Sequence, residues 1–250
     1  MGWFDSHCHL DFPAFDADRD AVVDRARSAG VEAILVPGVA SPAWGRVLAC
    51  RARYPDLVHV ALGLHPAFLD QVPVADLDAA LAELGPRLQG AGAVALGECG
   101  LDKLCAVPLD LQIRVFRTQL ELAARLDLPV LLHCVRAHGL MLELLAPFAP
   151  LQGVLHSYSG SAELVPRYAA MGLMFSFSGS VTRPRARRIR AAARAVPAER
   201  LLVETDAPDQ PPEGAPSRRN EPAHGRLVIE ALEALRGAAV PDNRGALLGG

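Results

Sequence analysis

The chain alternates short apolar runs with longer stretches in which apolar residues recur at helical spacing. The short runs, rich in valine, leucine and isoleucine, predict eight β-strands, at residues 2–7, 31–36, 57–62, 92–97, 129–133, 153–156, 173–176 and 201–204. The stretches after them predict eight helices, at residues 17–29, 42–53, 74–88, 109–126, 140–146, 162–170, 185–196 and 221–236. Because strand and helix alternate eight times, the pattern predicts an α/β fold, a (β/α)8 barrel of the TIM type.

The length of the chain agrees with one such barrel. Its 250 residues fit a single domain over 1–250, since α/β barrels of this size form one domain. An open, doubly wound parallel sheet is the alternative that the same alternation allows. The proline-rich stretch 207–216 is expected to form a long loop after the last strand, and 240–250 a short docking helix with a frayed tail.

Composition and charge exclude several classes of protein. Hydrophobic residues make up 51% of the chain and charged residues 21%, which is enough apolar material for a sizeable core and unlike a disordered chain. The net charge of −3 excludes a generally basic nucleic-acid coat, although it leaves room for a local basic patch. No signal peptide or membrane-spanning segment is evident, and five cysteines without a CxxC pair fit reduced thiols, so we expect a cytoplasmic protein.

Polar residues of metal-ligand type stand at the carboxyl ends of the predicted strands. In a parallel barrel these ends share one face, where the active sites of such barrels lie. One residue of this kind is common by chance, but a whole set is not, because buried imidazole and carboxylate groups are costly unless they are paired or bind metal. The residues are His7, His9, His65, Glu98, His133, His156 and Asp206.

The residue types indicate the chemistry of this face. Without His65, which is not needed to complete the set, four imidazoles and two carboxylates suit Zn, Mn, Fe, Ni or Mg ions and suffice for two of them. Two ions roughly 3.5–4 Å apart activate a water molecule and clamp the oxygens of a phosphodiester, so the predicted reaction is hydrolysis. The neighbouring Cys8, Cys99 and Cys134 are expected to face the helix layer rather than a metal.

Seven short motifs, in this order along the chain, resemble those of the TatD family. They are DSHCHLD at 5–11, GLHP at 63–66, GECGLD at 97–102, LH at 132–133, HSYSG at 156–160, ETDAP at 204–208 and RNEP at 219–222. The resemblance covers nearly the whole chain and implies a metal-dependent hydrolase of the amidohydrolase-like superfamily, a deoxyribonuclease that often acts 3′ to 5′ on single strands. It also implies that Glu98 bridges two divalent ions and that the metal ligands are His7, His9, Glu98, His133, His156 and Asp206.

Glu98 and Asp206 are the expected catalytic residues, with different roles. Glu98, between the histidines of the first strand and those of the fifth and sixth, could give one oxygen to each ion. Asp206 follows the last strand, which lies beside the first in a closed barrel. One of its oxygens could hold an ion while the other accepts a proton from the attacking water as general base.

Substrate contacts are expected from His65 and from four arginines, which are Arg136, Arg183, Arg185 and Arg219. Their predicted partner is DNA in single-stranded form, with no membrane and no obligate protein partner. His65 could instead hydrogen-bond its neighbours in a turn, and the basic run 183–190 could be a solvated helix face. The chain departs from the family pattern at Lys103, Val135 and Leu248.

Two other functions fit the same pattern of residues. A C–N or ester hydrolase of the same superfamily would act on a small cyclic amide. Many enzymes of that kind are described by a bridging carbamylated lysine on the fourth strand, where this chain has Glu98. A non-catalytic binding barrel would leave the polar groups at the mouth without a purpose.

Overall fold

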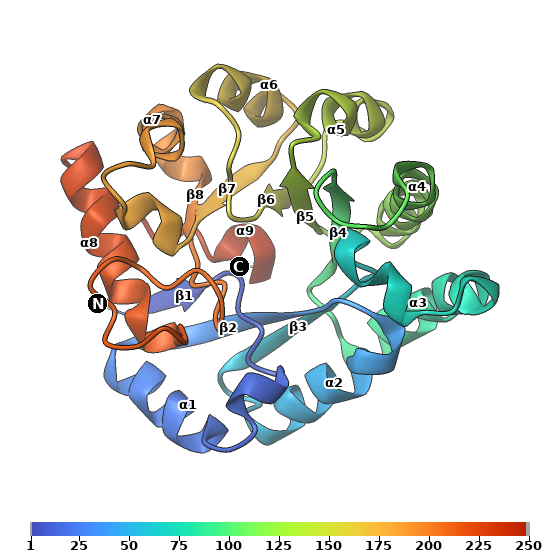
Figure 1. Ribbon diagram of the computed structural model, residues 1–250, viewed down its shortest axis with the longest axis horizontal. Coiled ribbons are helices and arrows are strands. Elements are labelled where there is room, and N and C mark those ends of the chain that lie inside the picture. The colour runs from blue at the N-terminus through green and yellow to red at the C-terminus, as the bar shows by residue number, and fades with distance from the viewer. Residues whose placement is uncertain (1, 249–250) are drawn as a thin grey trace.

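The computed structural model describes residues 2–248 and shows eight parallel strands surrounded by helices (Figure 1). The strands are β1 (Trp3–Asp5), β2 (Val31–Gly38), β3 (Val58–Leu62), β4 (Ala95–Asp102), β5 (Val130–Val135), β6 (Gly153–Leu155), β7 (Met174–Phe177) and β8 (Leu201–Val203). The α-helices are α1 (Arg19–Ser28), α2 (Trp44–Arg53), α3 (Leu77–Ala91), α4 (Leu109–Leu126), α5 (His138–Leu145), α6 (Val165–Ala170), α7 (Arg187–Ala195), α8 (Gly225–Arg236) and α9 (Gly245–Leu248). The strands pair in sequence order from β1 to β8, which confirms the predicted (β/α)8 barrel.

Backbone hydrogen bonds join the last strand to the first. The amide of Ser6 donates to the carbonyl oxygen of Val203 at 3.0 Å, and the amide of Asp206 donates to that of His7 at 2.9 Å. The open doubly wound sheet is therefore wrong, since such a sheet leaves its two edge strands apart. Closure also places the segment after β8 directly beside the segment after β1.

Several strand boundaries differ from the predictions in ways that affect the polar face, among them those of β1 and β4. β1 ends at Asp5, so His7 and His9 lie in the segment after the strand rather than within it. β4 continues to Asp102, so Glu98 lies inside this strand and not at its end. The pairing of β4 with β5 is irregular between Leu96 and Cys99, and this irregularity allows the strand to run past Glu98 while that side chain enters the barrel.

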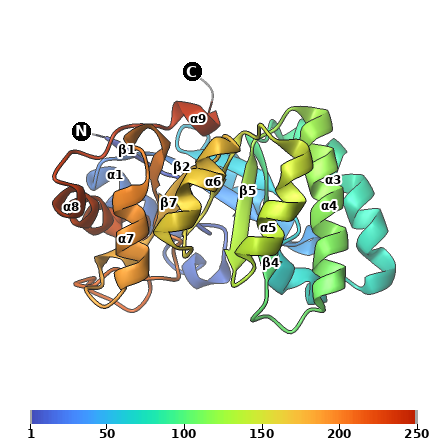
Figure 2. The same ribbon diagram turned by 90° about the horizontal axis from the view of Figure 1, so that it is seen from above.

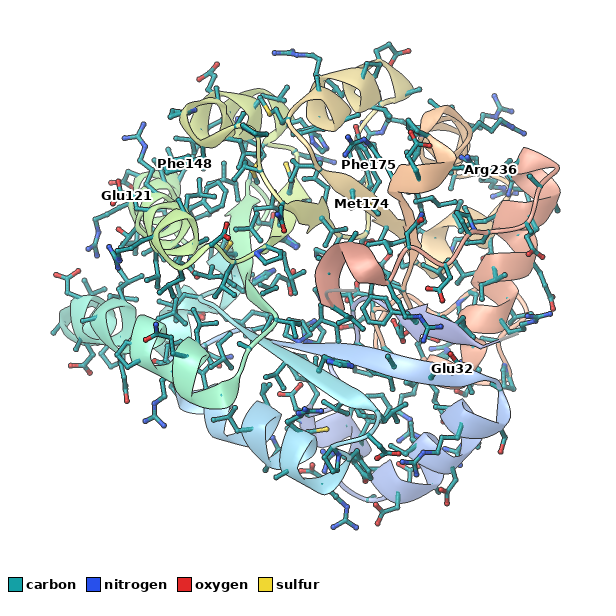
Figure 3. All side chains as sticks on the ribbon, turned by 180° about the vertical axis from the view of Figure 1, so that it is seen from behind. Glu32, Glu121, Phe148, Met174, Phe175 and Arg236 are labelled. Carbon is teal, nitrogen blue, oxygen red and sulfur yellow. The ribbon has the colours of Figure 1, made fainter. Side chains whose placement is uncertain are left out.

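The interior of the barrel is apolar at the end opposite to the polar face. Every strand contributes one residue to a small cluster, and β2 contributes two. Leu247 of α9 is also buried in this cluster, whose strand members are Phe4, Ala33, Leu35, Ala61, Ala95, Leu131, Val154, Met174 and Leu202. Seen from behind, α9 lies across this end near Met174 (Figure 3), and the side view places it opposite the loops that follow the strands (Figure 2). The predicted docking helix is thus confirmed, whereas the expected frayed tail includes 249–250, which lie outside the described residues.

A second apolar layer lies between the strands and the helices. Helix α4 illustrates its construction, because Val115, Phe116, Leu120 and Ala123 are buried at spacings of one, three and four residues. The helix ends where Asp127 adopts a left-handed conformation, with φ of 53°. Its observed bounds equal the predicted ones.

The same helix anchors the loop that carries His65. The buried side chain of Gln119 accepts from the amide of Leu64 at 2.8 Å and donates to the carbonyl oxygen of Leu64 at 3.0 Å. These two hydrogen bonds fix the position of Leu64, the residue directly before His65.

Among the described residues, no helix combines the length and the apolar character needed to cross a membrane.

Candidate metal centre

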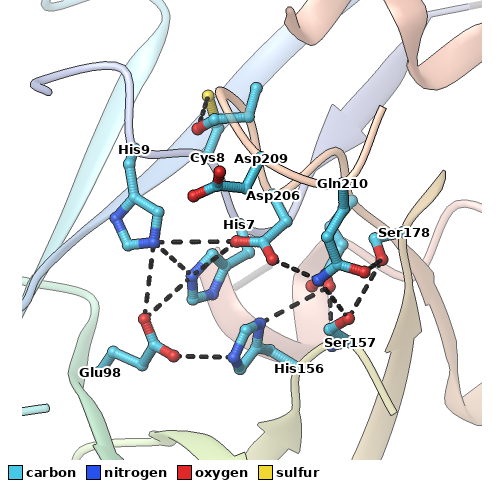
Figure 4. Close-up of polar contacts among 12 residues, drawn as sticks. His7, Cys8, His9, Glu98, His156, Ser157, Ser178, Asp206, Asp209 and Gln210 are labelled. Carbon is cyan, nitrogen blue, oxygen red and sulfur yellow. Dashed lines mark hydrogen bonds and ion pairs between the residues drawn. The ribbon is translucent and has the colours of Figure 1, made fainter. Parts of the chain in front are cut away.

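The six predicted ligands converge at the carboxyl end of the barrel. Figure 4 shows five of them, His7, His9, Glu98, His156 and Asp206. Glu98 lies in β4 and His133 in β5, whereas the other four follow strands: His7 and His9 after β1, His156 after β6 and Asp206 after β8. Five of the six are buried and His133 is half-buried. The sequence therefore places these side chains correctly near one another, although their role as metal ligands stays a prediction.

Glu98 is the centre of the cluster, and its two oxygens face different histidines. The Oε2 atom lies 3.2 Å from Nε2 of His7 and 3.6 Å from Nε2 of His9. The Oε1 atom lies 3.0 Å from Nδ1 of His133 and 2.7 Å from Nε2 of His156. Each oxygen thus faces its own group of histidine nitrogens, an arrangement that would allow the carboxylate to lie between two cations.

Asp206 completes the group nearest to β1. Its Oδ1 atom lies 3.8 Å from Nε2 of His7 and 3.7 Å from Nε2 of His9. Three sets of side chains bring potential ligand atoms within 4.8 Å of one another: His7, His156 and Asp206; His7, His9 and Glu98; and His65, Glu98 and His133. The Nε2 atoms of His7 and His9 are 3.3 Å apart, so a cation could contact both rings.

The charge distribution at the cluster also fits a cation. Burial alone would raise the pKa of Glu98, but the neighbouring His156, His65 and His7 outweigh burial and hold this pKa well below its ordinary value. Burial disfavours the charged form of His156, yet the attraction of Glu98 outweighs it and raises the pKa of His156 well above its ordinary value. Burial raises the pKa of Asp206 to about 6. Divalent ions would replace the protons that otherwise balance these carboxylates.

Two further carboxylates lie behind the histidines, and sequence reasoning did not assign them a role. Asp102 places Oδ2 at 3.2 Å from Nε2 of His133. Glu204 places Oε1 at 3.6 Å from Nδ1 of His156 and accepts a hydrogen bond from the amide of Ser157 at 2.7 Å. Asp102 hydrogen-bonds the ring of His133, and a carboxylate in that position fixes the orientation of a ligand histidine and raises its basicity. Glu204 lies beyond hydrogen-bonding distance of His156. The signal was their presence in the GECGLD and ETDAP motifs.

His65 lies against Glu98 at the edge of the cluster, where one of its ring nitrogens faces a carboxylate oxygen. The amide of Ala67 donates to Nδ1 of His65 at 3.0 Å, and burial lowers the pKa of His65 to about 4, so the ring is neutral and carries its proton on Nε2. This Nε2 lies 3.2 Å from Oε1 of Glu98. A protonated nitrogen offers no lone pair to a cation, so in this tautomer His65 would help to position Glu98 through this contact. Its contact with substrate phosphate stays a prediction.

Gln210 holds the second oxygen of Asp206, and sequence reasoning missed it. Its Nε2 atom donates to Oδ2 of Asp206 at 2.5 Å and to Oγ of Ser157 at 2.7 Å. Its Oε1 atom accepts from Ser178 at 2.7 Å and from Ser180 at 2.6 Å (Figure 4). The amide group therefore links the segments after β6, β7 and β8 to one carboxylate oxygen.

The four predicted arginines lie in different surroundings. Arg136 lines a cleft of about 360 Å³ that also reaches His133, His156 and Asp206. Arg183, Arg185 and Arg219 are not among the residues that line it. Arg183 donates to the carbonyl oxygen of Pro211 at 3.2 Å.

Arg219 is engaged by carboxylates. Its guanidinium group donates to both oxygens of Asp18, at 2.7 and 2.8 Å, and to Glu221 at 2.9 Å. It also lies over the ring of Phe15, 5.0 Å from its centroid. The predicted contact of Arg219 with substrate would have to form beside these ion pairs.

The three cysteines beside the ligands belong to the apolar layer. Cys8, Cys99 and Cys134 are all buried and pack in the core between strands and helices. Burial raises the pKa of each thiol. None is part of the candidate ligand groups found among residues 2–248, and the expectation that they do not bind metal stays a prediction.

A parallel (β/α)8 barrel whose carboxyl end gathers imidazoles around a carboxylate defines the class of metal-dependent hydrolase barrels. Within that class, the chain belongs to the family described as TatD related DNase, whose model matches residues 4–244. The predicted family is therefore confirmed.

Curated relatives and solved structures agree with this membership. The chain is 38% identical to the uncharacterized metal-dependent hydrolase YjjV of Escherichia coli over 98% of this chain and 95% of the relative. It is 36% identical to the 3′-5′ ssDNA/RNA exonuclease TatD of Pectobacterium atrosepticum, over 94% and 92%. The crystal structure of YjjV, a TatD homologue from Escherichia coli, superposes with a TM-score of 0.88 at 37% identity, over 98% of this chain and 95% of that one.

Proposed function

We propose that this metal-dependent hydrolase is a nuclease that removes nucleotides from the 3′ end of single-stranded DNA. The observation that carries the proposal is the placement of Glu98, whose two oxygens face separate groups of histidines as a phosphodiesterase with two ions requires. Family membership supports the reaction class, and several relatives bear the name 3′-5′ ssDNA/RNA exonuclease.

The donor set fits two divalent ions that share Glu98. His7, His9 and Asp206 would hold one ion, and His133 and His156 the other. Mixed imidazole and carboxylate donors suit Zn, Mn, Fe or Ni, and Mg remains a candidate of the same charge. When bound, these ions supply Lewis-acid activation of a water molecule and neutralise the charge of the scissile phosphate.

The side chains of the centre then orient the reactants and move a proton. Asp206 turns Oδ1 toward His7 and His9, and its Oδ2 accepts from Gln210. A carboxylate oxygen has two acceptor positions, so Oδ2 retains one for the proton of the attacking water. Asp206 is therefore the general base, and the contact with His65 helps to keep Glu98 in place between the two groups of histidines.

The test begins with protein stripped of metal by a chelator and reconstituted separately with Mn²⁺, Zn²⁺, Mg²⁺, Ni²⁺ or Fe²⁺. Each form is incubated with 5′-labelled single-stranded DNA, single-stranded RNA, duplex DNA, a generic phosphodiester and a small cyclic amide. We expect a ladder of products that shortens from the 3′ end of the DNA single strand, only in the presence of metal. Hydrolysis of the cyclic amide with intact DNA would contradict the proposal and support a C–N hydrolase.

A further inference from the structure

A cleft opens beside the metal centre between the segments that follow β5, β6 and β7. Its volume of about 360 Å³ falls within the roughly 300–1,000 Å³ of ordinary small-ligand sites. Its lining includes three residues of the candidate metal centre, His133, His156 and Asp206. It also includes two arginines outside that centre, Arg136 and Arg188. A ligand in the cleft would therefore touch both the metal centre and two guanidinium groups.

The guanidinium groups of these two arginines have no ion-pair partner among the described residues. Within residues 2–248, the structure shows no hydrogen bond or ion pair from the side chain of Arg136 or Arg188, in contrast to Arg219, which contacts Asp18 and Glu221. Among the residues that line the cleft, Asp206 is the only carboxylate, and it belongs to the metal centre. The rest of the cleft is thus a cationic surface without a counter-charge.

The position of each arginine is set by its backbone. Arg136 follows β5 directly and has a φ of 52°, a left-handed conformation that is uncommon for a residue with a side chain. Arg188 is the second residue of α7, and Ile189 beside it also lines the cleft. The preceding Arg187 is also exposed but is not among the lining residues.

The neutral groups of the cleft are hydroxyl and amide groups. Ser157, Ser159 and Ser180 line it together with Gln210. Burial, with a smaller contribution from the charge of Arg188, lowers the pKa of the lining residue His138, which therefore adds no positive charge near neutral pH. Hydroxyl groups next to guanidinium groups suit a ligand that combines a sugar with a phosphate.

We propose that this cleft is a second phosphate subsite, in which Arg136 and Arg188 bind the phosphate next to the scissile one. The assignment rests on the proposed nuclease function, because a strand whose scissile phosphate lies at the metal centre must continue along the surface from there. The cleft reaches the metal centre, has room for a nucleotide and carries unpaired positive charge. Arg188 enters as a substrate residue that the four predicted arginines did not include.

The experiment compares Arg136→Ala, Arg188→Ala and Arg188→Lys with Arg187→Ala, a matched control on the same helix. Steady-state constants are measured on single-stranded DNA at several salt concentrations. We expect Arg136→Ala and Arg188→Ala each to raise KM about tenfold with a smaller change in kcat, since each removes about one charge-assisted hydrogen bond. Arg188→Lys should recover part of the loss, and Arg187→Ala should match the unmodified protein.

The salt dependence adds a readout that loss of structure would not produce. Each lost phosphate contact should reduce the slope of log KM against log salt concentration by about 0.7. Equal KM values for Arg188→Ala and Arg187→Ala would overturn the subsite. So would an unchanged slope in both cleft variants.

Binding of deoxyadenosine monophosphate to the metal-loaded protein, measured by calorimetry, separates the subsite from the proposed function. If the unmodified protein binds this nucleotide more tightly than Arg188→Ala but does not hydrolyse DNA, the subsite stands and the nuclease proposal fails. If it hydrolyses DNA while all variants bind the nucleotide equally, the nuclease proposal stands and the subsite fails.

Discussion

Glu98 and Asp206 are both buried carboxylates of the same centre, but their surroundings differ. Both oxygens of Glu98 face histidine nitrogens, from His7 on one side to His156 on the other. Only Oδ1 of Asp206 faces the histidines, because Oδ2 accepts a hydrogen bond from Gln210. The first carboxylate is therefore placed to share two cations, whereas the protein itself fixes the orientation of the second.

The largest effect is expected from removal of Glu98. Glu98→Ala takes away the oxygens that both groups of histidines face, so we expect the loss of at least one ion per chain and a fall in kcat of more than about a thousandfold. Metal content after dialysis and the rate on single-stranded DNA are measured on the same sample. Full activity at saturating metal would contradict the two-ion account.

Asp206→Asn should separate metal binding from rate. The amide keeps one oxygen and nearly the same shape but is a poor proton acceptor, so more metal should remain than in Glu98→Ala while most of the rate is lost. Asp209→Asn is the matched control, because Asp209 is exposed and close in sequence. Equal metal loss in Glu98→Ala and Asp206→Asn would remove the distinction between the two carboxylates.

Gln210→Ala tests whether the hydrogen bond from Gln210 fixes the orientation of the Asp206 carboxylate. The change removes the donor to Oδ2 and the link to Ser157, Ser178 and Ser180. We expect kcat to fall by about 10–100-fold, as for other groups that orient a ligand, with little change in KM. A kcat equal to that of the unmodified protein would show that Asp206 holds its orientation without this hydrogen bond.

The ion pairs of Arg219 should give a small effect on stability. The hydrogen bonds from Arg219 lower the pKa of Asp18 from 3.8 to about 2. The ionised pair therefore stabilises the fold fully at pH values above the ordinary pKa of 3.8. This contribution is lost as pH falls from 3.8 through about 2. Both side chains are partly exposed, so Arg219→Ala should cost about 1 kcal/mol or less at neutral pH.

Thermal unfolding from pH 7 to pH 2 measures this difference. The gap in Tm between Arg219→Ala and the unmodified protein should shrink as Asp18 becomes protonated. A gap that stays constant over this range would assign the effect to the contact with Phe15 instead. A large rise in KM would support the predicted substrate role of Arg219.

The fold was largely predictable because its signals are local. The helical periodicity of residues 109–126 predicted both ends of α4, and the alternation of strand and helix predicted the barrel. The end of β1 and the extension of β4 past Glu98 were not predictable, since the first depends on closure against β8 and the second on irregular pairing with β5.

The candidate centre was predictable where residue type alone indicates chemistry. Histidines and carboxylates after apolar runs indicated the six converging side chains. Gln210 and Arg188 were missed for a different reason, because glutamine and arginine are common on surfaces. Their placement depends on a loop in which Gln210 has a φ of 49° and on which face of α7 borders the cleft.

The central proposal is that Glu98 would bridge two divalent ions that act together. The most direct measurement titrates the metal-free protein with Mn²⁺ and records, at each step, the ions bound per chain and the rate on single-stranded DNA. The account predicts two ions per chain, with most of the activity gained on binding of the second, and at most one ion in Glu98→Ala. Full activity with one ion per chain, or two ions retained by Glu98→Ala, would contradict it.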